Sequence, residues 1–245
     1  MNYGLQLYSV RDVTKIDFDG ALRAVAEMGY KMVEPAGFFG LPANEVKAMI
    51  DHYGLSVCST HTKYTEVFEN TLETIKYHKE IGCKNIILPS APLTNREEVD
   101  FAVENINRVL PIVEAEGMTL HYHNHSREFL PNLDGQIAEE EIANRTRVNL
   151  QLDTFWVFNA GLDPVLTMEK YRDRVSFIHL KDGIREHGEV KAIGKSVGSG
   201  EAPVIDVRKK AIEMGATIVI ESEGLDPTGL DEVKRCIDFL KKLEE

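Results

Sequence analysis

Eight short apolar runs alternate with longer amphipathic stretches along the chain. The runs read YGLQLYS, KMVEPA, LSVCSTH, KNIILPS, TLHYHNH, VNLQLDT, VSFIHLK and TIVIESE. Each is short and mostly β-branched or aromatic, which is typical of buried parallel strands. Repeated strand–helix units predict either a (β/α)8 barrel or a doubly wound sheet. Eight units in 245 residues favour the barrel, so we expect an α/β fold of the TIM-barrel class.

The stretches between the runs have the periodicity of helices. They cover residues 17–29, 43–54, 71–82, 96–117 and 229–245, and each of the first four ends in a glycine. A glycine just before an apolar run is typical of a helix-to-strand connection. No linker or low-complexity segment interrupts the pattern, so we expect one domain over residues 1–245. The glycine-rich segment IGKSVGSGEAP is interpreted as a long loop on that scaffold.

Composition restricts the class of partner and the compartment. A net charge of −12 disfavours nucleic acid and anionic membrane as partners, because both are themselves negatively charged. The three cysteines are scattered without a CxxC pair, as in a reducing compartment. The N-terminus has no signal-peptide pattern, and no apolar run approaches the ~18 residues of a membrane span. We therefore expect a cytoplasmic protein that acts on a small molecule.

Ionisable side chains stand at the ends of the last four runs. They are His123 and His125, Asp153, His179, and Glu221 with Glu223. In a barrel the C-terminal strand ends meet at one mouth, where active sites lie. Unpaired charges buried there are costly, so a shared divalent cation is expected to compensate them. Two imidazoles and two carboxylates suit Mn²⁺, Zn²⁺, Co²⁺ or Fe²⁺ better than Ca²⁺.

Each residue taken alone also has a plainer interpretation. His179 would serve as a hydrogen-bonded core histidine, Asp153 as a helix N-cap, and Glu221 as the partner of a nearby lysine. The joint pattern favours the metal site. Glu34, at the end of the second run, is a further candidate for the same mouth; the alternative is a salt-bridged surface glutamate.

Three histidines in TLHYHNH share one parity along the expected strand. At a rise of about 3.3 Å per residue, His121 lies roughly 6–7 Å below His123. Metal–nitrogen bonds are about 2.0–2.1 Å long, so one ion cannot bind both. We expect His123 to be the ligand and His121 a core residue. His125, just past the strand, is left as a substrate contact or acid–base partner.

The order of LQLYS, VE, HYHNH, LD, IHLKD and IVIESE resembles the sugar phosphate isomerase/epimerase family of xylose isomerase-like TIM barrels, over the whole chain. The resemblance implies one divalent metal, with Mg²⁺ added to the ions named above. The usual ligand set of the family is Glu, Asp, His, Glu. Asp153, His179 and Glu221 match its last three members, and His123 stands in the place of the first.

The resemblance also implies residues that hold the substrate. Arg185 matches a substrate-binding arginine of the family, and Glu128 matches a polar residue that helps to hold the sugar. Lys181 would hold substrate oxygens or a phosphate together with Arg185. The alternative for both cations is a solvated flank charge. The segment VGSGEAP lies where barrels often bind phosphate, and a loop without a ligand is its alternative.

The histidine at position 123 bears on the reaction. Epimerases of the family use two metal-bound glutamates on opposite sides of the substrate carbon, and only Glu221 remains of that pair. The YHNH string is nearer to members that resemble inosose dehydratases and keto-sugar lyases, which need one base and one acid.

We expect a metal-dependent sugar or sugar-phosphate isomerase or epimerase. It would work through proton abstraction beside a carbonyl and a metal-stabilised enediolate, with Glu221, His125 and Glu34 as catalytic candidates. A dehydratase or lyase of inososes or keto-sugars is the alternative, and a non-catalytic sugar-binding barrel is the second. An endonuclease IV-like repair enzyme conflicts with the acidic charge. The sequence leaves open the sugar, its phosphorylation, the metal and a homo-oligomeric state.

Overall fold

The computed structural model of the chain describes residues 1–185 and 192–244. Its parallel strands form a nearly closed barrel in the order β3-β2-β1-β10-β8-β7-β6-β5-β4. Their bounds are β1 Gly4–Gln6, β2 Met32–Glu34, β3 Ser56–Val57, β4 Thr60–His61, β5 Asn85–Leu88, β6 Thr119–His123, β7 Asn149–Asp153, β8 Val175–Ile184 and β10 Thr217–Glu221. The expected TIM-barrel fold is confirmed.

The third expected strand is divided into two, which is where the structure departs from the eight-strand expectation. β3 pairs with β2, and β4 pairs with β5, so the chain changes partners at Cys58 and Ser59. The Ser59 hydroxyl turns inward at this break and donates a hydrogen bond to the carboxylate of Glu34. The opening of the barrel therefore lies between β3 and β4, beside a buried polar group.

The glycine-rich segment also contains a short strand that the sequence did not predict. β8 continues well past His179, and β9 (Ile193–Lys195) pairs with its end in the antiparallel sense. The long β8 offers unpaired backbone groups there, and β9 satisfies them.

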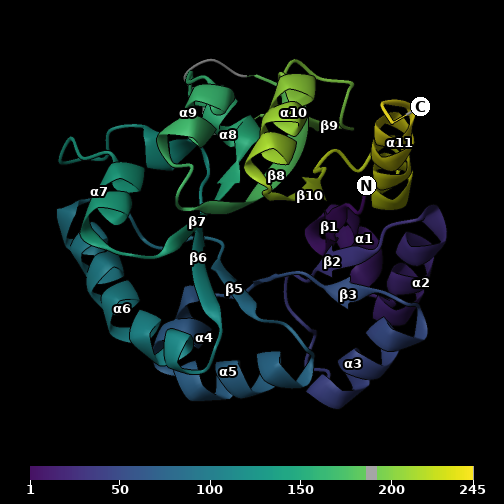
Figure 1. Cartoon of the computed structure of the whole chain (residues 1–245), viewed down its shortest axis with the longest axis horizontal. Helices are drawn as coiled ribbons and strands as arrows, with labels where there is room; N and C mark the ends of the chain where they lie inside the picture. Colours follow the sequence, from purple (N-terminus) through teal and green to yellow (C-terminus); the bar gives the residue numbers. More distant parts are fainter. Residues whose placement is uncertain (186–191, 245) are drawn as a thin grey trace.

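Helices surround the strands on the outside (Figure 1). They are α1 Arg11–Thr14, α2 Phe18–Met28, α3 Ala43–His52, α4 Tyr64–Glu69, α5 Thr71–Glu80, α6 Arg96–Ala115, α7 Ala138–Arg145, α8 Thr154–Asn159, α9 Pro164–Lys170, α10 Val204–Met214 and α11 Gly229–Lys242, with 3-10 turns at Leu7–Val10 and Ser126–Phe129. All five helices expected from periodicity are present. The amino group of Met1 lies 2.8 Å from the Glu244 carboxylate, so the two ends of the chain meet beside α11.

The ends of α2 show why the sequence predicted it. The Asp17 side chain accepts a hydrogen bond from the Gly20 amide and caps the first turn. Gly29 ends the helix with a φ of +103°, in the left-handed region that favours glycine. No helix in the described part of the chain is long and apolar enough to cross a membrane.

Candidate active site

Three of the predicted metal ligands converge at the C-terminal mouth of the barrel. Asp153 ends β7, Glu221 ends β10, and His179 lies between them on β8. Their ligand-capable atoms all lie within 4.8 Å of one another. Nδ1 of His179 is 3.2 Å from Oε2 of Glu221 and 3.9 Å from Oδ2 of Asp153. All three side chains are buried, so their charges cannot be left to water.

The two oxygens of Asp153 have different environments. Oδ1 accepts the backbone N–H groups of Phe155 and Trp156, each at 3.0 Å, and so caps α8. Oδ2 is buried and has no hydrogen-bond partner among the residues that the structure describes. The N-cap interpretation and the ligand interpretation therefore apply to separate atoms. A buried carboxylate oxygen without a donor, beside an imidazole nitrogen and a second carboxylate, fits a divalent cation.

Glu34 lies beneath this cluster and fixes the orientation of His179. Its Oε1 accepts Nε2–H of His179 at 2.7 Å, which leaves Nδ1 facing Asp153 and Glu221. Metal-binding histidines almost always donate their other ring N–H in this way. Burial alone would raise the pKa of Glu34, but His61 and His179 lower it to about 2. The catalytic role expected for Glu34 stays a prediction. Its contacts support a different role, which is to hold the His179 ring in place.

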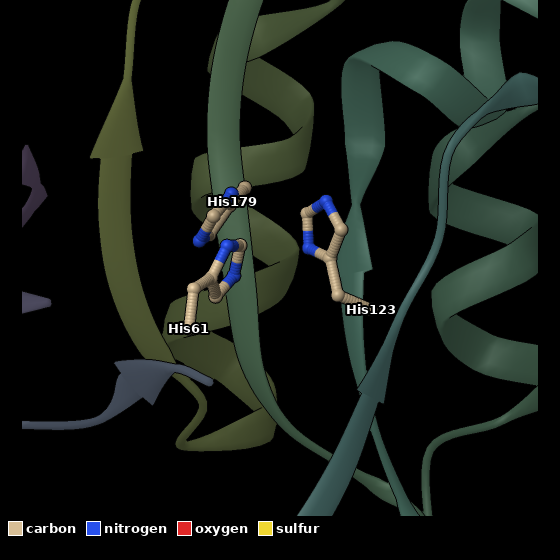
Figure 2. Close-up of side chains that lie close together, drawn as sticks. All are labelled: His61, His123 and His179. Atoms are coloured by element: carbon tan, nitrogen blue, oxygen red, sulfur yellow. The ribbon is translucent and has the colours of Figure 1, made fainter. Parts of the chain in front are cut away.

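His123 lies in a second group, with His61 and His179 (Figure 2). The His123 and His179 ring centroids are 4.8 Å apart, and the His61 ring stacks on that of His179 at 5.2 Å. Figure 2 shows the three imidazoles turned toward one another across the barrel. The assignment of His123 as a metal ligand stays a prediction, because it does not share one close group with Asp153 and Glu221.

Gln151 sets the tautomers of this histidine group. Its amide nitrogen donates to Glu34 at 2.7 Å, so its carbonyl oxygen faces the imidazoles. That oxygen accepts Nδ1–H of His123 at 2.9 Å and Nε2–H of His61 at 2.8 Å. Burial lowers the pKa of both imidazoles. Nε2 of His123 is thereby left as a lone-pair donor, as in a metal ligand.

His61 and Gln151 were missed by the sequence analysis. His61 ends the third run and obeys the same strand-end rule as the residues that were found. Gln151 precedes Asp153 by two positions and therefore points to the same side of β7. The strand-end rule therefore points to His61, and strand parity points to Gln151.

Lys181 brings a positive charge into the cluster. Its Nζ is 2.9 Å from Glu223, 3.4 Å from Glu221 and 3.7 Å from Asp153. It also lies 4.4 Å from the ring centre of Trp156. Burial would lower the pKa of Lys181, but the three carboxylates raise it above its ordinary value. The alternative interpretation of Glu221, pairing with a lysine, is therefore also realised.

One ammonium does not compensate all the carboxylates around it. Burial raises the pKa of Asp153 to about 7, with Lys181 opposing the rise and Glu221 adding to it. Burial acts in the same sense on Glu221, but Lys181 and His179 hold its pKa well below the usual value. The two carboxylates thus compete for the available positive charge, and a divalent cation would relieve that competition.

His125 and Glu128 form one unit just beyond β6. His125 is half-buried, lines the cavity at the mouth, and has an Nδ1 atom without a hydrogen-bond partner in the described structure. Burial lowers the pKa of its imidazole. The buried carboxylate of Glu128 accepts the backbone N–H of His125 at 2.8 Å. Glu128 thus holds the His125 turn, and its predicted contact with substrate stays a prediction.

Arg185 lies away from the cluster. Its guanidinium packs over the ring of Phe158, 5.3 Å from the centroid, and its backbone N–H donates to the Glu201 carboxylate. It is the last residue described before position 192. Its role in substrate binding stays a prediction.

The glycine-rich loop already holds an anion from the chain itself. The amides of Gly198, Gly200 and Ala202 donate to the carboxylate of Asp182 at 2.9, 2.8 and 3.1 Å. Donors of this kind would otherwise bind a phosphate. Because Asp182 uses them, these contacts do not support the predicted phosphate site.

A cavity of about 990 Å³ opens over the mouth of the barrel. Its inner part is lined by His61, His123, His125, Glu221 and Glu223. The His125 imidazole and the Glu221 carboxylate both line this part and come from different strands, just past β6 and at the end of β10. Two ionisable groups that line one concave site are the arrangement that proton-transfer chemistry needs.

Comparison with known proteins decides the family. Residues 22–243 match the family described as xylose isomerase-like TIM barrel. The chain belongs to this family. The resemblance seen in the sequence is confirmed, and so is its single-barrel fold.

Named relatives of this xylose isomerase-like barrel include inosose dehydratases. That of Geobacillus kaustophilus is 24% identical over an alignment of 189 residues, and the match covers 67% of this chain and 61% of the relative. That of Clostridium beijerinckii is 23% identical over an alignment of 188 residues, and the match covers 67% of this chain and 63% of the relative. The chain thus spans less than two thirds of the length of these relatives.

Solved structures extend the comparison to nearly the whole chain. A sugar phosphate isomerase/epimerase from Parabacteroides distasonis is 26% identical, with a TM-score of 0.84 and 98% of both chains covered. A probable 3-DHS dehydratase from Bacillus anthracis has a TM-score of 0.71 at 13% identity, covering 98% of this chain and 99% of that one. The second likeness shows the fold alone.

Proposed function

We propose that the chain is a divalent-metal-dependent enzyme that removes the proton beside the carbonyl of a keto-sugar or keto-polyol and expels the β-oxygen. It would thus be a dehydratase or lyase. The observation that carries this proposal is the unpartnered Oδ2 of Asp153 beside Nδ1 of His179 and Oε2 of Glu221. The inosose dehydratases among its relatives support elimination as the outcome of the reaction.

Four residues would hold the metal. Asp153, His179 and Glu221 provide the close group, and His123 would supply the fourth ligand through Nε2. Both histidines are held in the same way through the ring nitrogen that does not face the metal. That N–H group donates to Glu34 in His179 and to Gln151 in His123. Mn²⁺, Zn²⁺, Co²⁺, Fe²⁺ and Mg²⁺ are all compatible with this donor set. When bound, the ion would act as a Lewis acid that polarises the substrate carbonyl and acidifies the adjacent C–H group.

His125 is the proton carrier in this proposal. Its imidazole lines the cavity, and burial lowers its pKa, so it can accept the proton beside the carbonyl. The same imidazole then returns that proton to the departing β-oxygen, which leaves as water or an alcohol. The proton taken from carbon thus leaves with the expelled oxygen, and the imidazole returns to its starting state within one turnover. Glu221, the base expected from the sequence, is engaged by His179 and Lys181.

Lys181 and Glu34 support the step without moving the proton. Nζ of Lys181 is buried beside Glu221 and Glu223, which line the cavity, so its charge would favour an oxygen there that gains negative charge. Glu34 is fully buried and holds His179 in place. The half-buried His125 is in turn held by Glu128.

The sugar phosphate isomerase/epimerase structures favour a second candidate, isomerisation or epimerisation at the same carbon. Both reactions begin with the same proton removal, and they differ in the fate of the resulting enediolate. In an epimerisation, Glu221 would return the proton to the other face.

A screen with metal-loaded and chelated protein tests the proposal. Inososes, 3-keto-sugars and ketoses are incubated with each form, and the masses of the products are measured by mass spectrometry. The proposal predicts a product lighter by one water or one alcohol, formed only with metal. A product of unchanged mass would establish the second candidate. Equal conversion by chelated protein, or none by either form, would contradict metal-dependent catalysis.

A further inference from the structure

The cavity extends well beyond the residues that would meet a reacting carbon. Its volume of about 990 Å³ is at the upper end of the range, about 300–1,000 Å³, for sites that enclose drug-sized ligands. An outer part continues from the mouth over the β2–α3 loop and over α4 and α5. It is lined by Phe38, Phe39, Tyr77, Glu66, Asn70 and Glu73.

Aromatic rings form one wall of this outer part. The Phe38 and Tyr77 rings pack with centroids 4.7 Å apart, and the Tyr77 hydroxyl donates to the carbonyl of Leu41 at 2.8 Å. That hydrogen bond ties the β2–α3 loop to α5. Phe39 has a φ of +54° and is half-exposed, a conformation that a bulky residue seldom adopts. Backbone conformations of this kind cluster at ligand-binding positions.

Polar side chains with free acceptors form a rim beside this wall. Glu66, Asn70 and Glu73 are exposed, and their side chains have no hydrogen-bond or ion-pair partner among the described residues. Lys63 is the one cation among the described residues that line the cavity. Two carboxylates beside a single ammonium disfavour a phosphate here. Acceptors beside an aromatic wall suit a ring that has hydroxyl groups at its edge and C–H groups on its face.

We propose that this outer part is a second sugar subsite, which binds an uncharged pyranose ring joined to the reacting one. The substrate is then a neutral glycoside of disaccharide size. This inference rests on the proposed function for the position of the reacting ring. It agrees with the glycine-rich loop, whose amides bind Asp182 in place of a phosphate. The wall of Phe38 and Tyr77 carries the apolar face of the second ring, and Glu66, Asn70 and Glu73 accept its hydroxyls.

Calorimetric titration of the full chain with unreactive sugars tests the subsite. The ligands are glucose, cellobiose, maltose and glucose 6-phosphate. We expect a neutral disaccharide to bind about tenfold more tightly than glucose, a difference of about 1.4 kcal/mol in binding free energy. Phe38→Ala should remove the gain and leave glucose affinity unchanged. Phe101→Ala, on the exposed side of α6, is the matched control and should change neither.

The rim provides a variant that leaves the fold intact. Glu73 is exposed and has no partner among the described residues, so Glu73→Lys disturbs no buried contact there. This variant should also reduce the disaccharide gain. The subsite is overturned if neither disaccharide binds more tightly than glucose, if both rim and wall variants keep the gain, or if glucose 6-phosphate binds best. Binding needs no turnover, so a disaccharide gain without any conversion would leave the subsite standing while the proposed function fails.

Discussion

Glu139, on α7, is a buried carboxyl group outside the catalytic cluster, and it makes a pH-dependent prediction. Its side chain is 1% exposed, and neither oxygen has a hydrogen-bond partner in the described structure. Burial raises its pKa to about 8; Glu128 adds to the rise, while Lys170 and Arg174 oppose it. The pKa values of Tyr122 and Tyr171 are raised partly by its charge, so these side chains also face it.

The size of the effect follows from the two pKa values. The unfolded chain ionises Glu139 near 4.5, whereas the folded chain keeps it protonated up to about 8. Below pH 4.5 both states hold the proton, and the group has no effect on stability. Between pH 4.5 and 8 each pH unit lowers the free energy of unfolding by about 1.4 kcal/mol, to a total of about 5 kcal/mol. Above pH 8 the penalty is constant.

Replacing Glu139 with glutamine removes this penalty. We expect Glu139→Gln to match the parent protein within about 1 kcal/mol at pH 5 and to exceed it by several kcal/mol at pH 9. Urea unfolding at both pH values measures the difference. Glu140→Gln is the matched control, because Glu140 is exposed on the same helix and pairs with Lys170 at the surface. Parallel pH profiles for Glu139→Gln and the parent would refute the reasoning.

Three further predictions concern the metal site. Glu34→Gln should weaken metal affinity about 10–100-fold while the barrel stays folded, because it loosens the hold on His179; competition with a chromophoric chelator measures this. Lys181→Met should lower the melting temperature of the metal-free protein, because it leaves the carboxylates uncompensated. Added Mn²⁺ should then raise the melting temperature of the variant more than that of the parent. An equal rise in both proteins would count against a shared cluster. His125→Ala should retain the metal and stop exchange of the substrate proton with deuterated solvent, whereas His123→Ala should release the metal; the reverse pattern would mean that the two roles are exchanged.

The convergence of Asp153, His179 and Glu221 could be predicted because parallel strands bring their C-terminal ends to one mouth. Strand parity also placed His121 correctly in the core, where its Nε2 lies 2.8 Å from the Thr119 hydroxyl and it is 1% exposed. Both predictions follow from the order of the strands and from the alternation of side chains along each strand.

The support beneath the site could not be predicted in the same way. Whether Glu34 faces the cavity or lies under it depends on side-chain reach across the barrel, which the sequence pattern does not contain. The break in the third strand also coincides with a tertiary contact, the hydrogen bond that the Ser59 hydroxyl donates to Glu34. Both features concern which partner satisfies a buried polar group, and local periodicity carries no information about that choice.

The central claim is that Asp153, His179 and Glu221 bind one divalent metal ion, and Asp153→Asn tests it most directly. Asparagine is as good an N-cap as aspartate, so Oδ1 can still cap α8 while the ligand charge on Oδ2 is lost. Elemental analysis and chelator competition on the parent and the variant give the metal content and affinity, and circular dichroism checks the fold. The account predicts one ion per parent chain and a loss of more than about 100-fold in the variant, since loss of a supporting contact alone costs about 10–100-fold. A parent that binds no metal, or a folded variant that binds it equally well, would contradict it.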